Sequence, residues 1–363
     1  MLVTFVTGSV HSFSVFLVPF ERLLGLARAD VSLFYSCALV FLTISVLLGH
    51  HLYDRFSAFV LVSSSCLVAG AGLGIAAFAN TWLEVFIGYS VLFGLANGVA
   101  YGYVLQLSGR ALPSHKGFAM AAVTAAYAVG SVVFSFVLGN LIQAASLRGA
   151  LITLGSVIAA AGILSGLVMR SQNVSYDCET PAAPSTPAGL RPVVWLWLAY
   201  GCSVFAGLMA IGHAAGIIQH LGGDYRLAVW GAVLVGAGSS IGGFFIGAVI
   251  SRSNMIAWLL ALPLVSASCL LTLVFTTGPV LAMLLLSGVG FAYGAVIAVY
   301  PFAISEYFGD RGPKIYGRVF TAWGLSGLAG PWVAGWIFDT SGSYQFALVV
   351  ASAIALVSTA RAN

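Results

Sequence analysis

The sequence predicts an all-α membrane protein with twelve transmembrane helices in two pseudo-symmetric six-helix bundles. Three features indicate this class: the composition, the spacing of the charged residues, and a sequence repeat offset by 196 residues. Of the 363 residues, 60% are hydrophobic and 7% are charged, whereas a soluble domain carries about 25% charged residues. Ten acidic and fourteen basic side chains are too few to cover a water-soluble protein of this size. The outer surface must therefore contact lipid.

Eleven runs without Asp, Glu, Lys or Arg follow one another along the chain. Ten of them contain 20 to 32 residues, and a membrane-spanning helix needs about 20 apolar residues. The eleventh run has 53 residues, and we expect TTGP at 276–279 to divide it into two spans. These segments are too long for barrel strands, and a backbone in hydrocarbon must satisfy its own hydrogen bonds, so we expect helices. The runs are 1–20, 31–53, 56–83, 85–109, 117–147, 149–169, 192–223, 227–251, 253–305, 319–338 and 340–360.

The basic residues predict the orientation of the chain. If the N-terminus is cytoplasmic, ten of them lie on the inner side and four on the outer side, in agreement with the positive-inside rule. We therefore expect both termini in the cytoplasm, in a bacterial inner membrane, and we read the net charge of +4 as a topology signal and not as a nucleic-acid site. The first run continues directly into PFERLLG, so no removable signal peptide is expected. The four outer residues are Arg22, Arg28, Arg148 and Arg226.

A single compositional break divides the chain into two halves. The segment RSQNVSYDCETPAAPSTPAGLRP at 170–192 is rich in Pro, Ser, Thr and Ala and follows the sixth expected span, as is typical of a linker. We predict an N-terminal bundle at 1–170, a cytoplasmic linker at 171–192 and a C-terminal bundle at 193–363.

The two halves share short sequences at a constant offset. GLANG at 94–98 matches GFAYG at 290–294, and VLGNLI at 137–142 matches VAGWIF at 333–338. The matched segments are six spans apart, which indicates a duplicated six-helix unit with both copies in the same orientation. Glycines in such segments let neighbouring helices approach closely. The expected helix-packing positions are Gly94, Gly98, Gly290 and Gly294.

This duplicated pattern resembles the major facilitator superfamily over the whole chain, which implies the fold of that family. The family's loop signature after the second span, G-x-L-a-D-R-x-G, reads HHLYDRFS at 50–57, with both glycines missing. The second copy, GAVISRSN at 247–254, has serine in place of the acid. The resemblance implies that Asp54, Arg55 and Arg252 latch the two halves on the cytoplasmic side. The alternative is a plain charge pair at a helix end.

Two segments resemble the oxalate/formate antiporters and monocarboxylate transporters within that superfamily. They are SFSVFLVPFERLLGLARADVS at 12–32 and YGRVFTAWGLSGLAGPWVAGWIFDTSGSY at 316–344. Those relatives hold a substrate carboxylate with an arginine in span eight and a lysine in span eleven, which fall here on Gly243 and Trp323. The resemblance therefore implies that this chain does not clamp a dicarboxylate in the family manner.

Polar and aromatic side chains within the spans are the candidates for a substrate cavity. Spans one, four, seven and ten line the cavity in this superfamily, and His11 and His213 fall within spans one and seven. A histidine can carry a proton or donate to a carboxylate; the alternative is a neutral imidazole bonded to a neighbouring helix, and for the aromatic residues it is packing. The candidates are His11, Asn97, Tyr101, Tyr127, His213, Tyr293, Tyr300 and Trp323.

Enzyme, cofactor and metal motifs give no alternative that fits. GAGLG at 70–74 lies inside an expected span and follows no strand, so it does not predict a dinucleotide site. The five cysteines show no metal spacing and no pairing pattern. His50 and His51 precede Asp54, but the loop signature explains that acid better than a metal site does. The acidic residues nearest to the spans, at their ends, are Glu84, Glu306 and Asp339.

These features together predict a secondary transporter that works by alternating access, as a monomer in the lipid bilayer. We expect its cargo to be a small organic solute, with a monocarboxylate held by His11, Tyr101 and Tyr293 as the first choice. The main alternative is efflux of a neutral or amphipathic compound. An intramembrane enzyme, a structural membrane protein and an inactive transporter also stay open. No cofactor, metal or nucleic-acid partner is expected.

Overall fold

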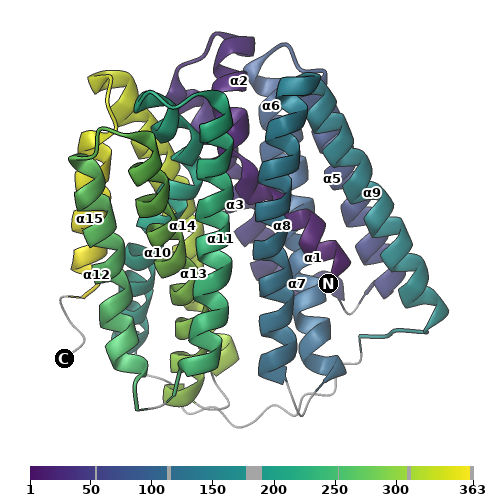
Figure 1. Cartoon of the computed structure of the whole chain (residues 1–363). Helices are drawn as coiled ribbons and strands as arrows, with labels where there is room; N and C mark the ends of the chain where they lie inside the picture. The colour runs from purple at the N-terminus through teal and green to yellow at the C-terminus, as the bar shows by residue number, and fades with distance from the viewer. Residues whose placement is uncertain (54, 113–115, 177–189, 252, 309–311, 360–363) are drawn as a thin grey trace. The chain divides into compact units, whose positions relative to one another are not determined.

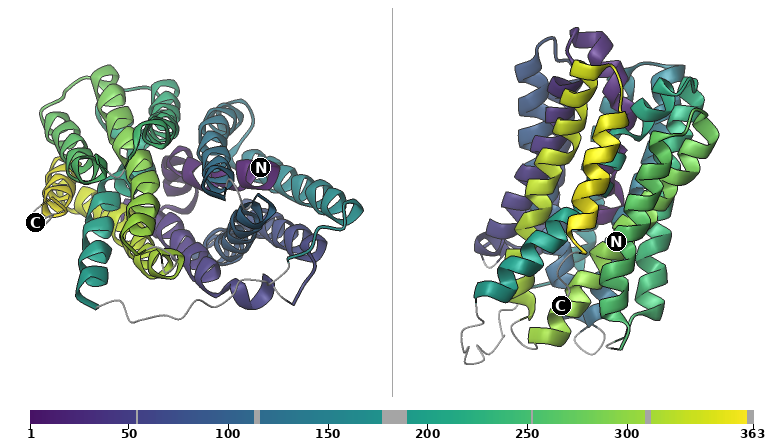
Figure 2. Two further views of the ribbon diagram at one scale, coloured as in Figure 1. Left: turned by 90° about the horizontal axis from the view of Figure 1, so that it is seen from below. Right: turned by 90° about the vertical axis from the view of Figure 1, so that its left-hand side faces the viewer.

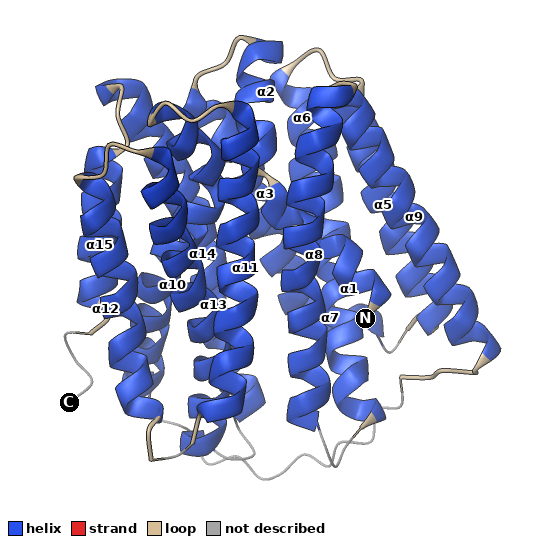
Figure 3. Ribbon diagram, viewed as in Figure 1, coloured by secondary structure: helices blue, strands red, loops and turns tan. Residues whose placement is uncertain are grey.

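The computed structural model consists of helices joined by loops, and the residues that it describes contain no strand (Figure 3). By their internal contacts the residues group into two compact units, Met1–Glu179 and Thr180–Asn363, here called the N unit and the C unit. Each unit is described by itself. The described residues are 1–53, 55–112, 116–176, 190–251, 253–308 and 312–359.

The N unit contains six long apolar segments, several of them built from more than one helical piece (Figure 1). The first is broken into three pieces, and the fourth combines a short α-helix, a π-helical segment and a longer α-helix. The pieces are α1 (Leu2–Thr7), the 3₁₀ segment η1 (Gly8–Ser12), α2 (Ser14–Leu24), α3 (Arg28–Leu48), α4 (His50–Tyr53), α5 (Ala58–Ala77), α6 (Trp82–Val85), the π segment η2 (Phe86–Phe93), α7 (Gly94–Ala111), α8 (Lys116–Ala144) and α9 (Leu147–Ser171).

The C unit contains six helices, and its first one is continuous where the first span of the N unit is broken. Figure 2 shows helices of the C unit nearly end-on when the molecule is seen from below, so they run roughly alongside one another. They are α10 (Leu190–His220), α11 (Tyr225–Val249), α12 (Met255–Val274), α13 (Pro279–Phe308), α14 (Gly312–Ser341) and α15 (Gln345–Val357).

Length and hydropathy qualify most of these segments as membrane spans. Within the described residues, nine helices are long and apolar enough to cross a membrane, and the bent pair in the first segment makes a tenth. Two further helices, the 30-residue α14 and the 13-residue α15, occupy the places expected for spans eleven and twelve. The predicted all-α membrane fold is confirmed, while the count of twelve beyond these ten spans stays a prediction.

The break in the first span is supported by side chains from neighbouring helices. Leu2–Ser12 and Ser14–Leu24 meet at an angle of 53°. The carbonyl of Thr7 accepts a hydrogen bond from the side-chain amide of Asn97 at 2.8 Å, and that of Val10 accepts one from the Tyr89 hydroxyl at 3.5 Å. Irregular backbone at membrane depth is tolerated only where other protein groups satisfy it. Span four therefore supports the break.

Glycines bring α7 close to α3 in the N unit. A Cβ atom placed on Gly94 or Gly98 would lie less than 3.0 Å from the carbonyl oxygen of Ala38 or Leu42, respectively. Real Cβ atoms essentially never approach a neighbour so closely. The two helices can therefore keep this separation only while both positions lack a side chain.

The matching glycines of the C unit make the corresponding approach. A Cβ atom on Gly290 or Gly294 of α13 would overlap the carbonyl oxygen of Val235 or Ser239 of α11. The duplicated pentapeptide thus makes one and the same contact twice, with span four against span two and span ten against span eight.

Side-chain hydrogen bonds join α10 to α14 along the C unit. The indole nitrogen of Trp197 donates to the hydroxyl of Thr321 at 2.8 Å, and the hydroxyl of Ser326 donates to the carbonyl of Gly201 at 2.8 Å. Such bonds between membrane helices are worth roughly 0.6 to 2 kcal/mol each. Several of them together hold the two helices in a fixed register.

An ion pair closes the turn between the first two spans. The guanidinium of Arg28 donates to both carboxylate oxygens of Glu21, with N–O distances of 2.5 and 2.9 Å. Gly25, between them, ends α2 in the left-handed conformation with φ of 62°, which glycine adopts without steric cost. The bidentate geometry fixes the start of span two relative to the end of span one.

Candidate functional site

Five polar and aromatic side chains of the N unit form a connected group, called here the N-unit cluster. They come from the broken segment of span one and from spans two, four and five. The members are His11, Tyr35, Asn97, Tyr101 and Tyr127. Four of them were predicted from the sequence as cavity candidates, and Tyr35 was not.

His11 lies on the 3₁₀ segment η1 and contacts two tyrosines. Its Nδ1 atom is 2.7 Å from the hydroxyl oxygen of Tyr35 on α3. The ring of Tyr127 on α8 meets the imidazole edge-on, with the ring centres 5.6 Å apart. His11 is half-buried and Tyr35 is fully buried. The two tyrosines therefore hold the imidazole from different helices.

Asn97 joins three spans through its side-chain amide. It is fully buried on α7, donates from Nδ2 to the carbonyl of Thr7 at 2.8 Å, and accepts at Oδ1 from the hydroxyl of Tyr127 at 3.2 Å. A buried amide needs such partners because an unmade hydrogen bond costs about 1–3 kcal/mol. Asn97 thus connects span one to spans four and five.

Tyr101 extends the cluster by one turn along α7. Its ring packs on that of Tyr127 with centres 4.9 Å apart, and its hydroxyl is 3.4 Å from the hydroxyl of Thr124. Thr124 donates its own proton to the carbonyl of Met120 at 3.2 Å, so Tyr101 is the donor in this pair. At 3.4 Å the bond is long, and a stronger acceptor such as a carboxylate could take its place.

Glycines also permit the close contact of span one with span five. A Cβ atom on Gly8 would overlap the carbonyl oxygen of Tyr127, and one on Gly130 would overlap the carbonyl oxygen of Phe5. Neither position was predicted from the sequence. Their signal in the sequence is only a glycine in each span, which is weak in a chain with 43 glycines.

The aromatic candidates of the C unit form two separate pairs. The indole nitrogen of Trp323 donates to the hydroxyl of Tyr293 at 2.8 Å, and the Trp323 ring stacks on that of Phe320 with an interplanar angle of 10°. Tyr300 packs against Tyr200 instead, with ring centres 4.7 Å apart. The structure therefore brings Tyr293 and Trp323 together and places Tyr300 in a different contact.

His213 is fully buried, and both of its ring nitrogens have partners within the C unit. Its Nε2 atom is 2.7 Å from the carbonyl oxygen of Pro331, and its Nδ1 atom is 2.9 Å from the hydroxyl of Tyr344. A carbonyl can only accept, so Nε2 carries the proton. This arrangement supports the alternative of an imidazole bonded to neighbouring helices, because it joins α10, α14 and the start of α15.

The expected gating residues are described only in part. Arg55 follows α4 and is exposed. Asp54 and Arg252 lie outside the described residues. The latch between the halves is therefore still a prediction from the resemblance.

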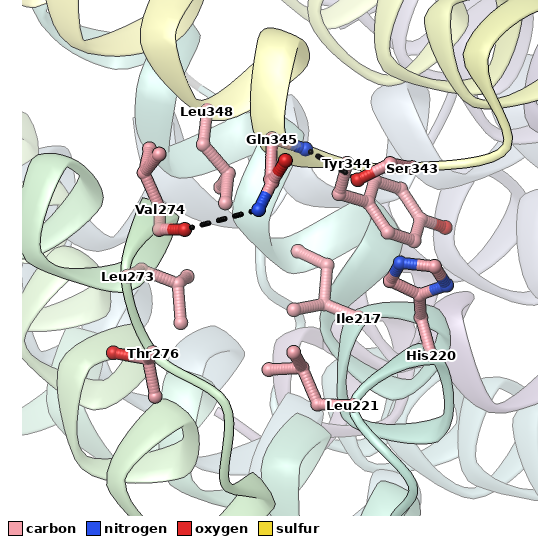
Figure 4. Close-up of a pocket in the computed structure, with 10 residues that line it drawn as sticks. All are labelled: Ile217, His220, Leu221, Leu273, Val274, Thr276, Ser343, Tyr344, Gln345 and Leu348. Atoms are coloured by element: carbon pink, nitrogen blue, oxygen red, sulfur yellow. Dashed lines mark hydrogen bonds between the residues drawn. The ribbon is translucent and has the colours of Figure 1, made fainter.

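A small cavity lies at one end of the C unit, and Tyr344, the partner of His213, is one of the residues that line it (Figure 4). Its volume is about 50 Å³, and Figure 4 shows His220 beside Tyr344, with Gln345 donating to the carbonyl of Val274 at 3.4 Å. None of the eight cavity candidates lines it. A space of this size suits one or two water molecules better than an organic solute.

These features define a polytopic helical membrane protein with a hydrogen-bonded, uncharged cluster within the spans of its first unit. The profile of the Major Facilitator Superfamily matches residues 1–312. The chain therefore belongs to the Major Facilitator Superfamily, a family of membrane transporters, and it is a multi-pass integral membrane protein. The relationship predicted from the loop and the repeats is confirmed.

Relatives and solved structures agree with this assignment. The chain is 25% identical to the Uncharacterized MFS-type transporter YhjX of Escherichia coli (strain K12), over 90% of this chain and 84% of that protein. It is 22% identical to Monocarboxylate transporter 12 of Xenopus laevis, over 93% of this chain and 80% of that protein. A bacterial homolog to the human lysosomal transporter Spinster has the same fold, with a TM-score of 0.70 and 14% identity over 99% of this chain and 94% of that one.

Proposed function

We propose that the protein is a secondary transporter that moves a small monocarboxylate across the membrane by alternating access. Its family supports the transporter class, and relatives named monocarboxylate transporters support this choice of solute. The observation that carries the proposal is the N-unit cluster, because it gathers hydrogen-bonding groups at a break in span one. Broken helices near the bilayer midplane form the solute sites of many secondary transporters.

The proposed site holds the carboxylate by hydrogen bonds and without a fixed positive charge. His11 and Tyr101 act as donors to its two oxygens, and Tyr293, predicted from the sequence as a third donor, belongs to the same proposal. Asn97 and Tyr127 keep His11 and Tyr101 in place. The two halves rock about this site, and the close-packed glycines allow each half to move as one body.

The cellular setting belongs to the same proposal. The protein acts as a monomer in the inner membrane of a bacterium, with both termini in the cytoplasm. The latch role that the family resemblance implies for Asp54, Arg55 and Arg252 is part of the same proposal.

Transport by purified protein in liposomes tests this function. Formate, lactate, pyruvate and oxalate are offered in turn, with and without a pH gradient across the membrane. Uptake or exchange of the three monocarboxylates, with oxalate left behind, is the expected result. Empty liposomes give the background. Transport of oxalate in preference to the monocarboxylates, or of none of the four acids, would refute the proposal.

A second candidate is efflux of a neutral or amphipathic compound. The observation that favours it is the aromatic pair of Trp323 and Phe320. The family resemblance places an arginine at Gly243 and a lysine at Trp323, and this chain has neither. A site without these charges suits a solute that carries no charge. No transport of any of the four acids, together with efflux of a lipophilic dye from cells that produce the protein, would favour this candidate.

A further inference from the structure

We propose that Tyr35 is a positioning residue that fixes the tautomer of His11, so that Nε2 of the neutral imidazole carries the proton and donates to the carboxylate of the solute. This inference rests on the proposed function, because the solute is the one assigned above. Its structural basis is the contact of 2.7 Å between the Tyr35 hydroxyl and Nδ1 of His11. Tyr35 itself has no contact with the solute in this scheme.

The direction of the bond follows from the acidity of the two groups. The imidazole pKa of about 6.5 belongs to the protonated ring and shows that the bare ring nitrogen is a good proton acceptor. A phenol, with a pKa of about 10, is a stronger acid than the N–H of a neutral imidazole and its oxygen is a weaker base, so the phenol is the better donor and the imidazole nitrogen the better acceptor. The Tyr35 hydroxyl therefore donates to Nδ1. A neutral imidazole has one N–H, and with Nδ1 accepting, that proton is on Nε2.

The packing around Tyr35 holds its side chain in one position. Its side chain is fully buried, and its ring stacks on that of Phe13 at 5.3 Å between centres and 7° between planes. Phe13 is buried in turn and packs on Tyr89 at 5.4 Å. A side chain whose rotamer is locked by packing can hold a functional group in one geometry. The hydroxyl of Tyr35 therefore has little freedom to leave Nδ1.

A second tyrosine and the neighbouring backbone also hold the imidazole. Tyr127 meets the His11 ring edge-on at 82°, and the backbone next to His11 is held because the carbonyl of Thr7 accepts from Asn97. These contacts do not themselves decide which ring nitrogen bears the proton. The other tautomer would turn a lone pair toward a carboxylate and repel it. Tyr35 settles this choice.

The tautomer can be read directly, independently of transport. Histidine labelled with ¹⁵N gives different chemical shifts for protonated and unprotonated ring nitrogens, and the difference between wild-type and His11→Asn spectra identifies the His11 signals. While the imidazole of His11 is neutral, we expect the wild-type protein to show an unprotonated Nδ1 and a protonated Nε2. A wild-type spectrum with the proton on Nδ1 overturns the proposal, and this reading requires no variant at position 35.

Tyr35→Phe removes the hydroxyl and keeps the ring that stacks on Phe13. We expect a mixture of tautomers at His11 and a KM for the monocarboxylate that is about 3- to 10-fold higher, with the maximal rate changed less. Tyr103→Phe is the matched control: it removes a buried hydroxyl on α7 that has no hydrogen-bond partner among the described residues. We expect this control to keep the wild-type tautomer and KM.

The two readouts separate the possible failures. If Tyr35→Phe leaves the tautomer unchanged, Tyr35 does not fix it and the inference is wrong. If the tautomer changes but KM does not, Nε2 of His11 does not donate to the solute, and the role in transport is overturned. If wild-type protein moves no monocarboxylate at all, the proposed function fails, and the ¹⁵N spectrum still decides whether Tyr35 sets the tautomer.

Discussion

The two histidines within the spans have different surroundings. His11 is half-buried and contacts tyrosines of spans two and five, whereas His213 is fully buried and both of its ring nitrogens are bonded to protein groups. They are 202 residues apart in the sequence, not the 196 of the repeat, so they are not equivalent positions of the duplicated unit. We therefore expect His11 to take part in transport and His213 to stabilise the C unit.

Replacing His11 tests the first part of that expectation. Histidine is the side chain whose ordinary pKa lies between pH 5 and 8, so its loss should remove the titration of the site. We expect His11→Ala to abolish the pH dependence of transport, measured as initial uptake into proteoliposomes over a series of pH values. A pH profile that keeps its wild-type shape would exclude His11 from the mechanism.

Replacing His213 should change stability and not the affinity for solute. His213→Ala leaves the Tyr344 hydroxyl and the Pro331 carbonyl without their bonds to the imidazole, and each loss costs about 1–3 kcal/mol. Tyr344→Phe removes one of these bonds, so its effect should be smaller. Thermal unfolding in detergent shows which of the two variants loses more stability. The KM of the folded protein is expected to stay at the wild-type value. A raised KM at unchanged stability would indicate that His213 contacts the solute.

The sequence predicted most members of the N-unit cluster but not their connections. Asn97 and Tyr101 were identified because they are four residues apart on one helix, and His11 because a histidine in a span is rare. Tyr35 was not predicted, because its partner is on another helix and no periodicity in the sequence relates residues of separate spans. Contacts across helices depend on how the helices pack, and that is decided by the whole bundle.

At the scale of the elements, glycine sets the distance between helices α3 and α7 and between α11 and α13. The same four glycines carry the repeat in the sequence. Because these contacts are backbone against backbone, the neighbouring helices cannot adapt by turning a side chain. We therefore expect these positions to tolerate even alanine poorly.

Alanine at these glycines should lower stability. In Gly98→Ala and Gly294→Ala the added methyl group meets a carbonyl oxygen of the facing helix, and overpacking of this kind costs about 1–3 kcal/mol. Gly74→Ala on α5 is the control, because a Cβ atom there has no neighbour within 4 Å; it should be neutral or slightly stabilising. Unfolding temperatures in one detergent compare the three. Equal temperatures for all three would show that the helices have room to move apart.

Charge-free runs located the spans well, but they gave no sign of the break in span one. The break falls at residues 8–12 without a proline in that segment. It is stabilised by contacts from other helices, above all the amide of Asn97, and such contacts are not visible in the local sequence. The π segment at 86–93 was not anticipated either, for the same reason.

At the scale of the whole molecule, the two units have kept their packing and changed their polar groups. Both use the same glycine contact between equivalent spans. In contrast, the N unit carries the cluster around a broken first span, while α10, the corresponding span of the C unit, is continuous and tied to α14. The duplication thus left two similar frames, of which the first carries most of the hydrogen-bonding groups proposed for the solute.

The orientation of the whole chain can be tested with two introduced cysteines. Gln172 follows α9 and Asn80 lies between α5 and α6, and both are exposed. The excess of basic residues on one side predicts that Gln172→Cys is cytoplasmic and Asn80→Cys is external. An impermeant thiol reagent added to intact cells should label only the second variant, with the unmodified protein as background. Labelling of Gln172→Cys alone would show that the chain has the opposite orientation to the one predicted.

The bond from Asn97 to the carbonyl of Thr7 has a mechanical consequence. It joins the interrupted stretch of span one to span four, just four residues before His11. A shift of span four would pull on that joint and so carry the imidazole with it. Binding of the solute at His11 and movement of the N-terminal bundle would therefore be coupled directly, without a further hinge between them.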